Sequence, residues 1–386
     1  MSRPAVEVAD IVRAQGDRFI GQSGWLSYQQ LSVLRAITRC RTTALGGHID
    51  QCSACGHQAI SYNSCRNRHC PKCQAQARHR WIAAREKELL DVPYFHVVFT
   101  IPNELNALCL RNARVLYNLL FRASSAAMLE VAANPKRLGA QIGFISILHT
   151  WGQNLLLHPH VHCVIPAGGF SADHQRWIRP KYAFFLPVAV LSVVFRAKFV
   201  QGLRRAFRQR KLVFSGIVSQ LAELDRFSAF LDLLFRQRWV VYAKPAFGSP
   251  GRVLRYLGRY THRVAISNHR LLAFDGDQVT FRWKDYAHGN KQRKMTVSGG
   301  EFLRCFSQHI LPRGFVRIRQ FGFLTNRRRS EYLALARQLL RAATPVARTN
   351  TVLPTWRCPH CHAEMRIGPN LSARQLAAWC QRLDSS

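Results

Sequence analysis

Apolar side chains along the chain follow either helical or strand spacing, and the pattern predicts an α+β protein. Helical spacing is found over residues 28–41, over a basic stretch at 75–90 and over a long segment at 105–133. Runs rich in β-branched and aromatic residues predict strands at 94–101, 143–150 and 158–165. A strand, a long helix and two more strands form the first half of a ferredoxin-like or RRM-like sheet, in which the strand at 158–165 would be central.

Shifts in composition divide the chain further. Residues 171–250 have the pattern of a mostly helical insertion, and residues 267–286 that of a hairpin that turns at 275–277. Beyond about residue 340 the composition shifts to Ala, Thr and Pro, which predicts a linker before a short tail. We therefore expect an N-terminal part at 1–93, a central domain at 94–340 and a tail at 341–386.

The charge of the chain points to a polyanionic partner. Lys and Arg number 56 against 20 acidic residues, which gives a formal net charge of +36. Neutralising phosphates with such cations releases counterions and supplies most non-specific affinity for nucleic acid, although a ribosomal-type or membrane-surface protein would have a similar charge. Residues 1–19 lack the apolar core of an export signal, and the longest apolar stretch, 184–195, is broken by Pro187. We expect a cytoplasmic, nucleoid-associated protein without a membrane partner.

Cysteines predict a zinc-binding module within the N-terminal part. Two C-x-x-C pairs stand fourteen residues apart and supply four thiolates for one tetrahedral zinc ion, as in a zinc ribbon: Cys52, Cys55, Cys70 and Cys73. Cys65 and His69 are alternative ligands in the same stretch, and a redox-active or simply buried cysteine cluster is the competing interpretation. Three cations lie between the ligands and are candidates for contacts with DNA: Arg66, Arg68 and Lys72.

The tail contains a further cysteine pair. Cys358 and Cys361 form half of a zinc site, which Cys380 or His362 would complete. Unpaired surface thiols are an equally good interpretation of this spacing.

Two histidines one residue apart predict a second kind of metal site. On the expected strand, His160 and His162 project from one face, and the flanking Val161 and Val164 suggest that the imidazoles point away from the core. Imidazoles with oxygen ligands suit Mg²⁺ or Mn²⁺, and the candidates for a third ligand are Gln153, which we prefer, and His158. For an isolated pair of this kind, ordinary strand histidines would be the more frequent interpretation.

Two tyrosines four residues apart are candidate nucleophiles. Tyr256 and Tyr260 would share one side of a helix, and Arg259 and Arg263 beside them would hold a phosphodiester and stabilise a phenolate. Simple packing of the two rings is the alternative. Because a phenol is a poor nucleophile near neutral pH, a nearby divalent ion that polarises the phosphate would be needed.

At these motifs the chain resembles the rolling-circle transposases of bacterial insertion sequences, of the two-tyrosine HUH type known as the IS91 family. The resemblance covers the cysteine module, the strand at 94–101, the histidine motif HPHVHCVIPAGG and the tyrosine segment YLGRYTHRVAISN. It implies an HUH endonuclease domain with the ferredoxin-like sheet and the helical insertion. It also implies that His160 and His162 hold the catalytic metal, and that Tyr256 or Tyr260 attacks a DNA phosphate to leave a 5′-phosphotyrosine and a free 3′-hydroxyl.

This resemblance implies a transposase that nicks and joins single-stranded DNA at element termini and target sites. No nucleotide-binding G-x-x-x-x-G-K-[ST] motif is found, so host helicase and replication enzymes would displace the strand. Three arginines near phenylalanines are further candidates for contacts with single-stranded DNA: Arg317, Arg319 and Arg327. A rolling-circle replication initiator or a non-catalytic zinc-dependent DNA-binding protein would share many of these features.

Overall fold

The computed structural model describes residues 4–181, 185–247, 258, 265–285, 288–341 and 356–384. Two compact units divide the chain differently from the boundaries expected at 93 and 340. Unit 1 comprises Met1–Ala77, His262–Ile310 and Ala347–Ser386, and unit 2 comprises Arg78–Thr261 and Leu311–Val346. Among the helices described, none has the length and apolar character needed to cross a bilayer.

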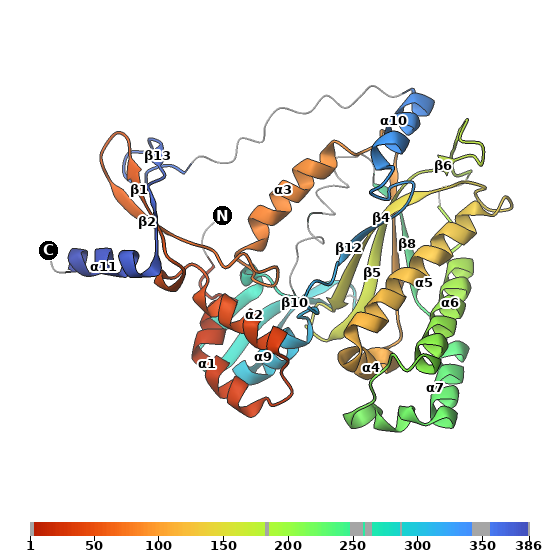
Figure 1. The fold of residues 1–386 in the computed structure, drawn as a ribbon, viewed down its shortest axis with the longest axis horizontal. Coiled ribbons are helices and arrows are strands. Elements are labelled where there is room, and N and C mark those ends of the chain that lie inside the picture. Colours follow the sequence, from red (N-terminus) through yellow and green to blue (C-terminus); the bar gives the residue numbers. More distant parts are fainter. Residues whose placement is uncertain are drawn as a thin grey trace. The chain divides into compact units, whose positions relative to one another are not determined.

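Unit 2 is built on an antiparallel sheet of five strands (Figure 1). The strands, from one edge to the other, are β12 (Ile318–Gly322), β4 (Gly143–Trp151), β5 (Leu157–Pro166), β3 (Tyr94–Thr100) and β8 (Val241–Phe247). Strand β5 therefore occupies the middle of the sheet, where the order of elements in the sequence predicted it. Its position between β4 and β3 leaves it paired along both edges, so it is a rigid platform for the side chains that it carries.

Helices cover one face of this sheet. The long helices α5 (Ala113–Ala133) and α6 (Val188–Arg208) pack against each other there (Figure 1), and Phe99, Leu148 and Val161 project into the same apolar core. Because side chains alternate along a strand, the residues on either side of Val161 face away from these helices. Val164 also lies on that second face, packed with Ile147, so the expectation that it marks the helix-covered core is wrong for this residue.

The long helix expected at 105–133 is interrupted at Asn112. The segment forms a 3-10 turn η2 (Asn103–Leu105), α4 (Asn106–Arg111) and then α5. The side chain of Asn112 accepts a hydrogen bond from the Val213 amide at 2.7 Å and donates to the Val213 carbonyl at 2.9 Å. Asn112 thus uses its amide group to hold the loop after α6, which explains why a polar residue is buried at this break.

The expected insertion is helical for most of its length. After the short strands β6 (Gly169–Phe170) and β7 (Trp177–Ile178) it contains α6, the 3-10 helix η3 (Gly216–Ala222) and α7 (Leu224–Arg236). It then returns as β8, which pairs with β3 and completes the sheet edge. Unit 2 also contains α10 (Arg329–Leu340), and the connecting helix α3 (Gln74–Glu86) crosses the boundary between the units.

Unit 1 combines a helical cluster with a small sheet. The helices are α1 (Val8–Gln22), α2 (Tyr28–Arg39) and α9 (Gly299–Gln308). The sheet contains the expected hairpin, with β9 (Leu271–Phe274) and β10 (Gln278–Asp285), together with β11 (Lys291–Ser298), which the sequence pattern did not reveal. Asp275 fixes the turn, because its side chain accepts hydrogen bonds from the amides of Asp277 and Gln278. Unit 1 also contains the 3-10 turns η1 (Thr43–Leu45) and η4 (Asn268–Arg270).

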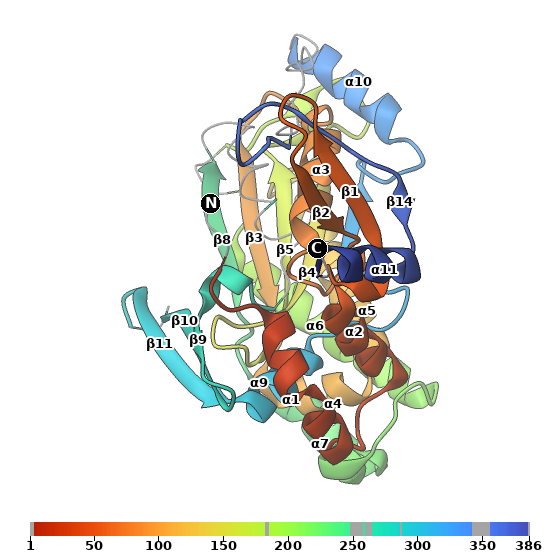
Figure 2. The ribbon, with the colours of Figure 1, turned by 90° about the vertical axis from the view of Figure 1, so that its left-hand side faces the viewer.

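The C-terminal segment belongs to the N-terminal part of the chain. Strand β1 (Gly47–Cys52) pairs with β2 (Gln58–Tyr62), and also with the short strands β13 (Met365–Arg366) and β14 (Asn370–Leu371). Figure 2 shows β1, β2 and β14 together with α11 (Ala373–Asp384), and Figure 1 labels β13. The segment that the composition suggested as a separate tail is therefore part of the module that holds the N-terminal cysteines.

Candidate metal centres

Three histidines gather on the second face of the sheet in unit 2, opposite α5 and α6. His160 and His162 project from β5, and His149 on the neighbouring strand β4 is the cross-strand partner of His160. Their ligand nitrogens lie within 4.8 Å of one another, and all three rings are at least nine-tenths buried. The structure therefore brings the two predicted imidazoles together and adds a third that sequence reasoning missed.

Hydrogen bonds aim the ring nitrogens of this cluster at one point. His160 Nδ1 lies 2.6 Å from the His158 carbonyl oxygen; since a carbonyl only accepts, Nδ1 carries the proton and Nε2 of the neutral ring presents a lone pair. That Nε2 is 3.1 Å from Nε2 of His162. Two nitrogens bound at about 2.1 Å and at right angles around one ion would lie about 3.0 Å apart, so the spacing suits a shared divalent cation.

Burial lowers the pKa of two histidines at this site, His160 and His96. It lowers the pKa of His160 to about 3, with a smaller contribution from neighbouring His158. Burial also lowers the pKa of His96 to about 4. His96 projects from β3 and its Nε2 lies 2.8 Å from Nδ1 of His162, so it orients that ring and leaves Nε2 of His162 to face His160. Neutral imidazoles at physiological pH are ligands rather than cations.

The signal for His149 was present in the sequence but weak. The sequence predicts a strand at 143–150, and His149 lies near its end. That His149 faces the same side as His160 and His162 follows only from the register of β4 on β5. Gln153 lies in the turn between these strands, and its role as a ligand stays a prediction.

The tyrosine segment is described at one residue only. Tyr256, Tyr260, Arg259 and Arg263 all lie outside the described residues. Gly258, between the two tyrosines, is helical and buried, and the side chain of Ile82 on α3 approaches it so closely that a Cβ at this position would come within 2.3 Å of Ile82 Cδ1.

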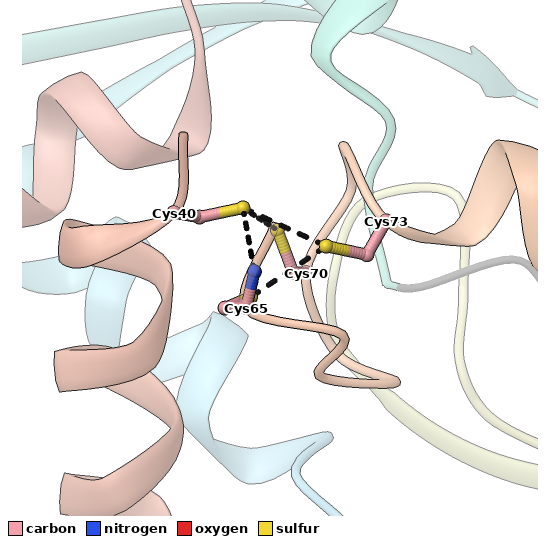
Figure 3. Close-up of side chains that lie close together, drawn as sticks. All are labelled: Cys40, Cys65, Cys70 and Cys73. Carbon is pink, nitrogen blue, oxygen red and sulfur yellow. Dashed lines mark hydrogen bonds between the residues drawn. The ribbon is translucent and has the colours of Figure 1, made fainter. Parts of the chain in front are cut away.

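Four cysteines form a first cluster in unit 1 (Figure 3). They come from the end of α2 and from the loop after β2, and they are Cys40, Cys65, Cys70 and Cys73. Three of the sulfur–sulfur distances are 3.6 Å, close to the roughly 3.8 Å expected for thiolates bound at 2.3 Å around a tetrahedral zinc ion. The pKa of Cys73 is lowered, because the thiols of Cys40, Cys65 and Cys70 donate to its thiolate.

The other predicted pair of cysteines lies in a second cluster. Cys52 and Cys55 lie beside Cys358 and Cys361, with sulfur–sulfur distances of 3.4 Å between Cys52 and Cys361 and 3.6 Å between Cys55 and Cys358. The single site predicted from the two N-terminal pairs is therefore not what the structure contains. Each pair instead finds its partners elsewhere in the chain, the first among the tail cysteines and the second in Cys40 and Cys65.

Two of the expected alternates have different outcomes. Cys65 is a member of the first cluster, whereas His69, although buried, is in neither cysteine cluster. Cys380 lies on α11 outside both clusters. Cys40 was not predicted as a ligand, because it stands alone at the end of a helix, 25 residues before Cys65, the next member of its cluster.

The predicted DNA-binding cations differ in their surroundings. Lys72 forms an ion pair with Glu7, and Arg68 is half-buried. Arg317 is buried, whereas Arg66 and Arg327 are exposed. Arg319 places its guanidinium over the Phe121 ring, 4.2 Å from the centroid, and donates to Asn118 Oδ1 at 2.5 Å. Exposure therefore favours Arg66 and Arg327 as contacts for a large polyanion, while Lys72 and Arg319 already have intramolecular partners.

The cysteine clusters and the excess of Lys and Arg describe a basic protein with cysteine sites suited to zinc. Residues 11–101 match the family model described as a transposase zinc-binding domain, and residues 143–331 match the model described as a putative transposase. The chain belongs to the IS91 family of transposases. Structural zinc follows from the matched domain together with the cysteine clusters.

Two relatives match nearly the whole chain. A putative transposase of Sinorhizobium fredii, y4qJ, is 49% identical over 380 residues, which cover 95% of this chain and 96% of the relative. The transposase for insertion sequence element IS801 of Pseudomonas savastanoi pv. phaseolicola is 29% identical over 360 residues, or 89% of this chain and 84% of the relative.

One solved structure matches part of the chain: the conjugative relaxase TrwC in complex with oriT DNA, in its metal-free form. It is 13% identical and covers 43% of this chain and 71% of its own, with a TM-score of 0.23. A score of this size does not establish a common fold.

Proposed function

We propose that this transposase nicks and joins single-stranded DNA at element ends through a 5′-phosphotyrosine intermediate, in support of rolling-circle transposition. The observation that carries the proposal is the cluster of His149, His160 and His162 on the central strands of a sheet, in a chain that also contains two tyrosines four residues apart. Such a reaction needs a site that activates a phosphodiester and a nucleophile that retains the cleaved strand.

The topology of unit 2 supports an HUH-type nuclease domain with a ferredoxin-like sheet. In chain order the elements are a strand, a helix, two strands, two helices and a strand: β3, α5, β4, β5, α6, α7 and β8. The strands lie in the spatial order β4-β5-β3-β8, with β12 added at the edge beyond β4. In this arrangement the histidine strand β5 is central, and its histidines face away from α5 and α6.

The histidine cluster would hold Mg²⁺ or Mn²⁺. When bound, the ion would polarise the scissile phosphate and offset negative charge that develops on the leaving oxygen. His149, His160 and His162 would bind it through ring nitrogens, and His96 would keep the ring of His162 in its orientation. Gln153 is proposed as a further ligand from the adjoining turn.

Tyr256 or Tyr260 would attack the phosphorus of the DNA backbone. The phenolic oxygen forms a bond to phosphorus, the bond from phosphorus to the 3′-oxygen breaks, and this oxygen leaves as a 3′-hydroxyl after taking up a proton. A 3′-hydroxyl can later attack the phosphotyrosine and release the tyrosine, so the bond energy is retained and no nucleotide is hydrolysed. Arg259 and Arg263 would hold the phosphate, and the second tyrosine permits a second cleavage while the first strand is still attached.

A cavity beside the histidine face of the sheet suits single-stranded DNA. It lies along β12 and β4, and its lining includes Trp81, Arg85 and Asn326. An indole ring stacks on any base, and a guanidinium contacts phosphate, so this combination binds single strands without strong sequence preference. Of the other predicted cations, the exposed Arg66 and Arg327 would contact further phosphates, whereas Arg68, Lys72, Arg317 and Arg319 are partly or fully buried. Host helicase and replication enzymes would supply strand displacement, on nucleoid-associated DNA in the cytoplasm.

The test is cleavage of single-stranded DNA that carries the ends of the protein's own element, labelled at the 5′ or 3′ end, in Mg²⁺, Mn²⁺ or EDTA. We expect a metal-dependent covalent protein–DNA adduct that the Tyr256→Phe/Tyr260→Phe double variant does not form. The single variants order the two nucleophiles. Tyr28→Phe is the matched control, because Tyr28 is 80% exposed at the start of α2. This variant should cleave like the wild type.

Four results would count against the proposal. An adduct that persists in the double variant would place the nucleophile elsewhere. Cleavage that is equal in EDTA would remove the role of the histidine cluster. Tight binding without any cleavage would leave a zinc-dependent DNA-binding protein, while cleavage only at a replication origin would indicate a rolling-circle initiator.

A further inference from the structure

The second cysteine cluster joins two segments that are distant in the sequence. Cys52 is the last residue of β1 and Cys55 lies in the turn after it, whereas Cys358 and Cys361 precede β13, and Cys52 is the register partner of Met365 in the β1–β13 pair. The matched transposase zinc-binding domain ends at residue 101, so it includes only the first two of these cysteines.

The two cysteine pairs have corresponding backbone hydrogen bonds, although they share little sequence. In each, one bond goes to the sulfur of the first cysteine and two involve its backbone. In the first pair these are Ala54 N to Cys52 Sγ at 3.4 Å, Gly56 N to Cys52 O at 3.2 Å and Cys52 N to His57 O at 2.8 Å. In the second they are His360 N to Cys358 Sγ at 3.4 Å, His362 N to Cys358 O at 3.0 Å and Cys358 N to Ala363 O at 2.8 Å.

The backbone conformation of the two pairs also corresponds. The residue after the second cysteine in each pair adopts a positive φ: Gly56 at +73° and His362 at +60°. A non-glycine residue at positive φ is uncommon, although histidine adopts it more readily than most, so the conformation of His362 at the place of Gly56 shows that both pairs use the same turn. Amides directed at a cysteine sulfur stabilise a thiolate, which is the form that binds a metal.

The geometry of the four sulfurs fits one ion better than it fits disulfides or separate thiols. Cys361 Sγ lies 3.4 Å from Cys52 Sγ and 3.5 Å from Cys55 Sγ, so one sulfur approaches two others at a distance far beyond the roughly 2.05 Å of a disulfide bond. Cys52 and Cys358 are buried with Met365 in a small apolar cluster, while Cys55 and Cys361 are exposed.

We propose that this cluster is a second structural zinc site, shared between the two segments, with the four ligands Cys52, Cys55, Cys358 and Cys361. The protein then carries two zinc ions in unit 1, and the zinc-binding domain is completed by residues 356–384. The metal fastens β13, β14 and α11 to β1, where the strand pairing alone is only two residues long at each contact. This proposal is independent of the nicking activity.

The first test is the zinc content of the full-length protein. We expect two zinc ions per chain in the wild type and one in the Cys358→Ser/Cys361→Ser variant. Cys380→Ser is the matched control, because Cys380 lies in the same segment but outside both clusters, and this variant should retain two. One zinc ion in the wild type that is unchanged in the double variant would overturn the proposal.

A second measurement uses the wild-type protein and does not depend on the folding of any variant. Cys55 and Cys361 are exposed, so without a bound ion they should react readily with N-ethylmaleimide. We expect mass spectrometry to find both thiols protected in the zinc-loaded protein and alkylated at least tenfold faster after chelation. Equal rates of alkylation before and after chelation would contradict a metal site at these cysteines.

Discussion

Replacement of Arg319 tests whether this predicted DNA-binding residue is mainly a structural one. Its guanidinium lies over Phe121 and donates to Asn118 Oδ1, both on α5, and it comes from β12 at the edge of the sheet. A hydrogen bond from a charged donor contributes about 1.5–3 kcal/mol, and a cation–π contact about 0.5–2 kcal/mol. Since Arg319 is only partly buried, we take the low ends and expect Arg319→Ala to destabilise unit 2 by about 2 kcal/mol.

Urea unfolding of the zinc-loaded protein, followed by tryptophan fluorescence, measures this loss. With an m value of about 3 kcal/mol/M, about 2 kcal/mol lowers the midpoint by about 0.7 M. Arg327→Ala is the matched control, because Arg327 is exposed and has no hydrogen bond or ion pair among the described residues. It should unfold like the wild type but bind single-stranded DNA more weakly at low salt. An unchanged midpoint for Arg319→Ala, with weaker DNA binding, would refute the structural interpretation.

Three further substitutions test the sheet and its histidine face. His149→Ala should weaken Mn²⁺ binding at least tenfold in calorimetric titration, whereas His174→Ala, a histidine outside the cluster, should not; equal affinities would remove His149 from the site. Val161→Thr places a hydroxyl in the helix-covered core and should lower the free energy of unfolding in urea by about 1–3 kcal/mol; an unchanged value would mean that Val161 faces the other side. In Gly322→Ala the new Cβ would lie 1.8 Å from the Ile142 carbonyl oxygen at a φ of +60°, so we expect a loss of more than about 2 kcal/mol, and a wild-type midpoint would show that the β12 edge is positioned differently.

Secondary structure could be predicted where one periodicity dominates. The strands β3, β4 and β5 and the helices α2 and α5 lie close to their expected ranges, because each has a long apolar run of one period. Strand β11 was missed, since its sequence, KQRKMTVS, has exposed charges where an apolar face would be expected. A strand that borders only a small sheet gains little from burial and leaves little signal in its composition.

The sequence predicted cysteine and histidine metal sites, but it did not predict which residues form each site. From the sequence, each C-x-x-C pair is expected to share a metal with the nearest other pair, because a short loop costs less entropy to close. Here β1 pairs with β13 across most of the chain, which brings Cys52 to Cys358 instead of Cys70. In the same way, the register of β4 on β5 brings His149 to His160. The pairing of strands that are distant in the sequence determines which residues form both sites, and this pairing cannot be inferred from one sequence.

The pairing of β1 with β13 and β14 has a consequence for how the protein is made. Cys52 and its register partner Met365 are separated by roughly 300 residues, which a ribosome needs roughly 15–60 s to add. During that interval one edge of β1 has no partner strand, and an unpaired edge is a template for pairing with other chains. The first module to emerge is therefore among the last to be completed, so chaperone protection early in synthesis should affect the yield of this protein more than its final stability.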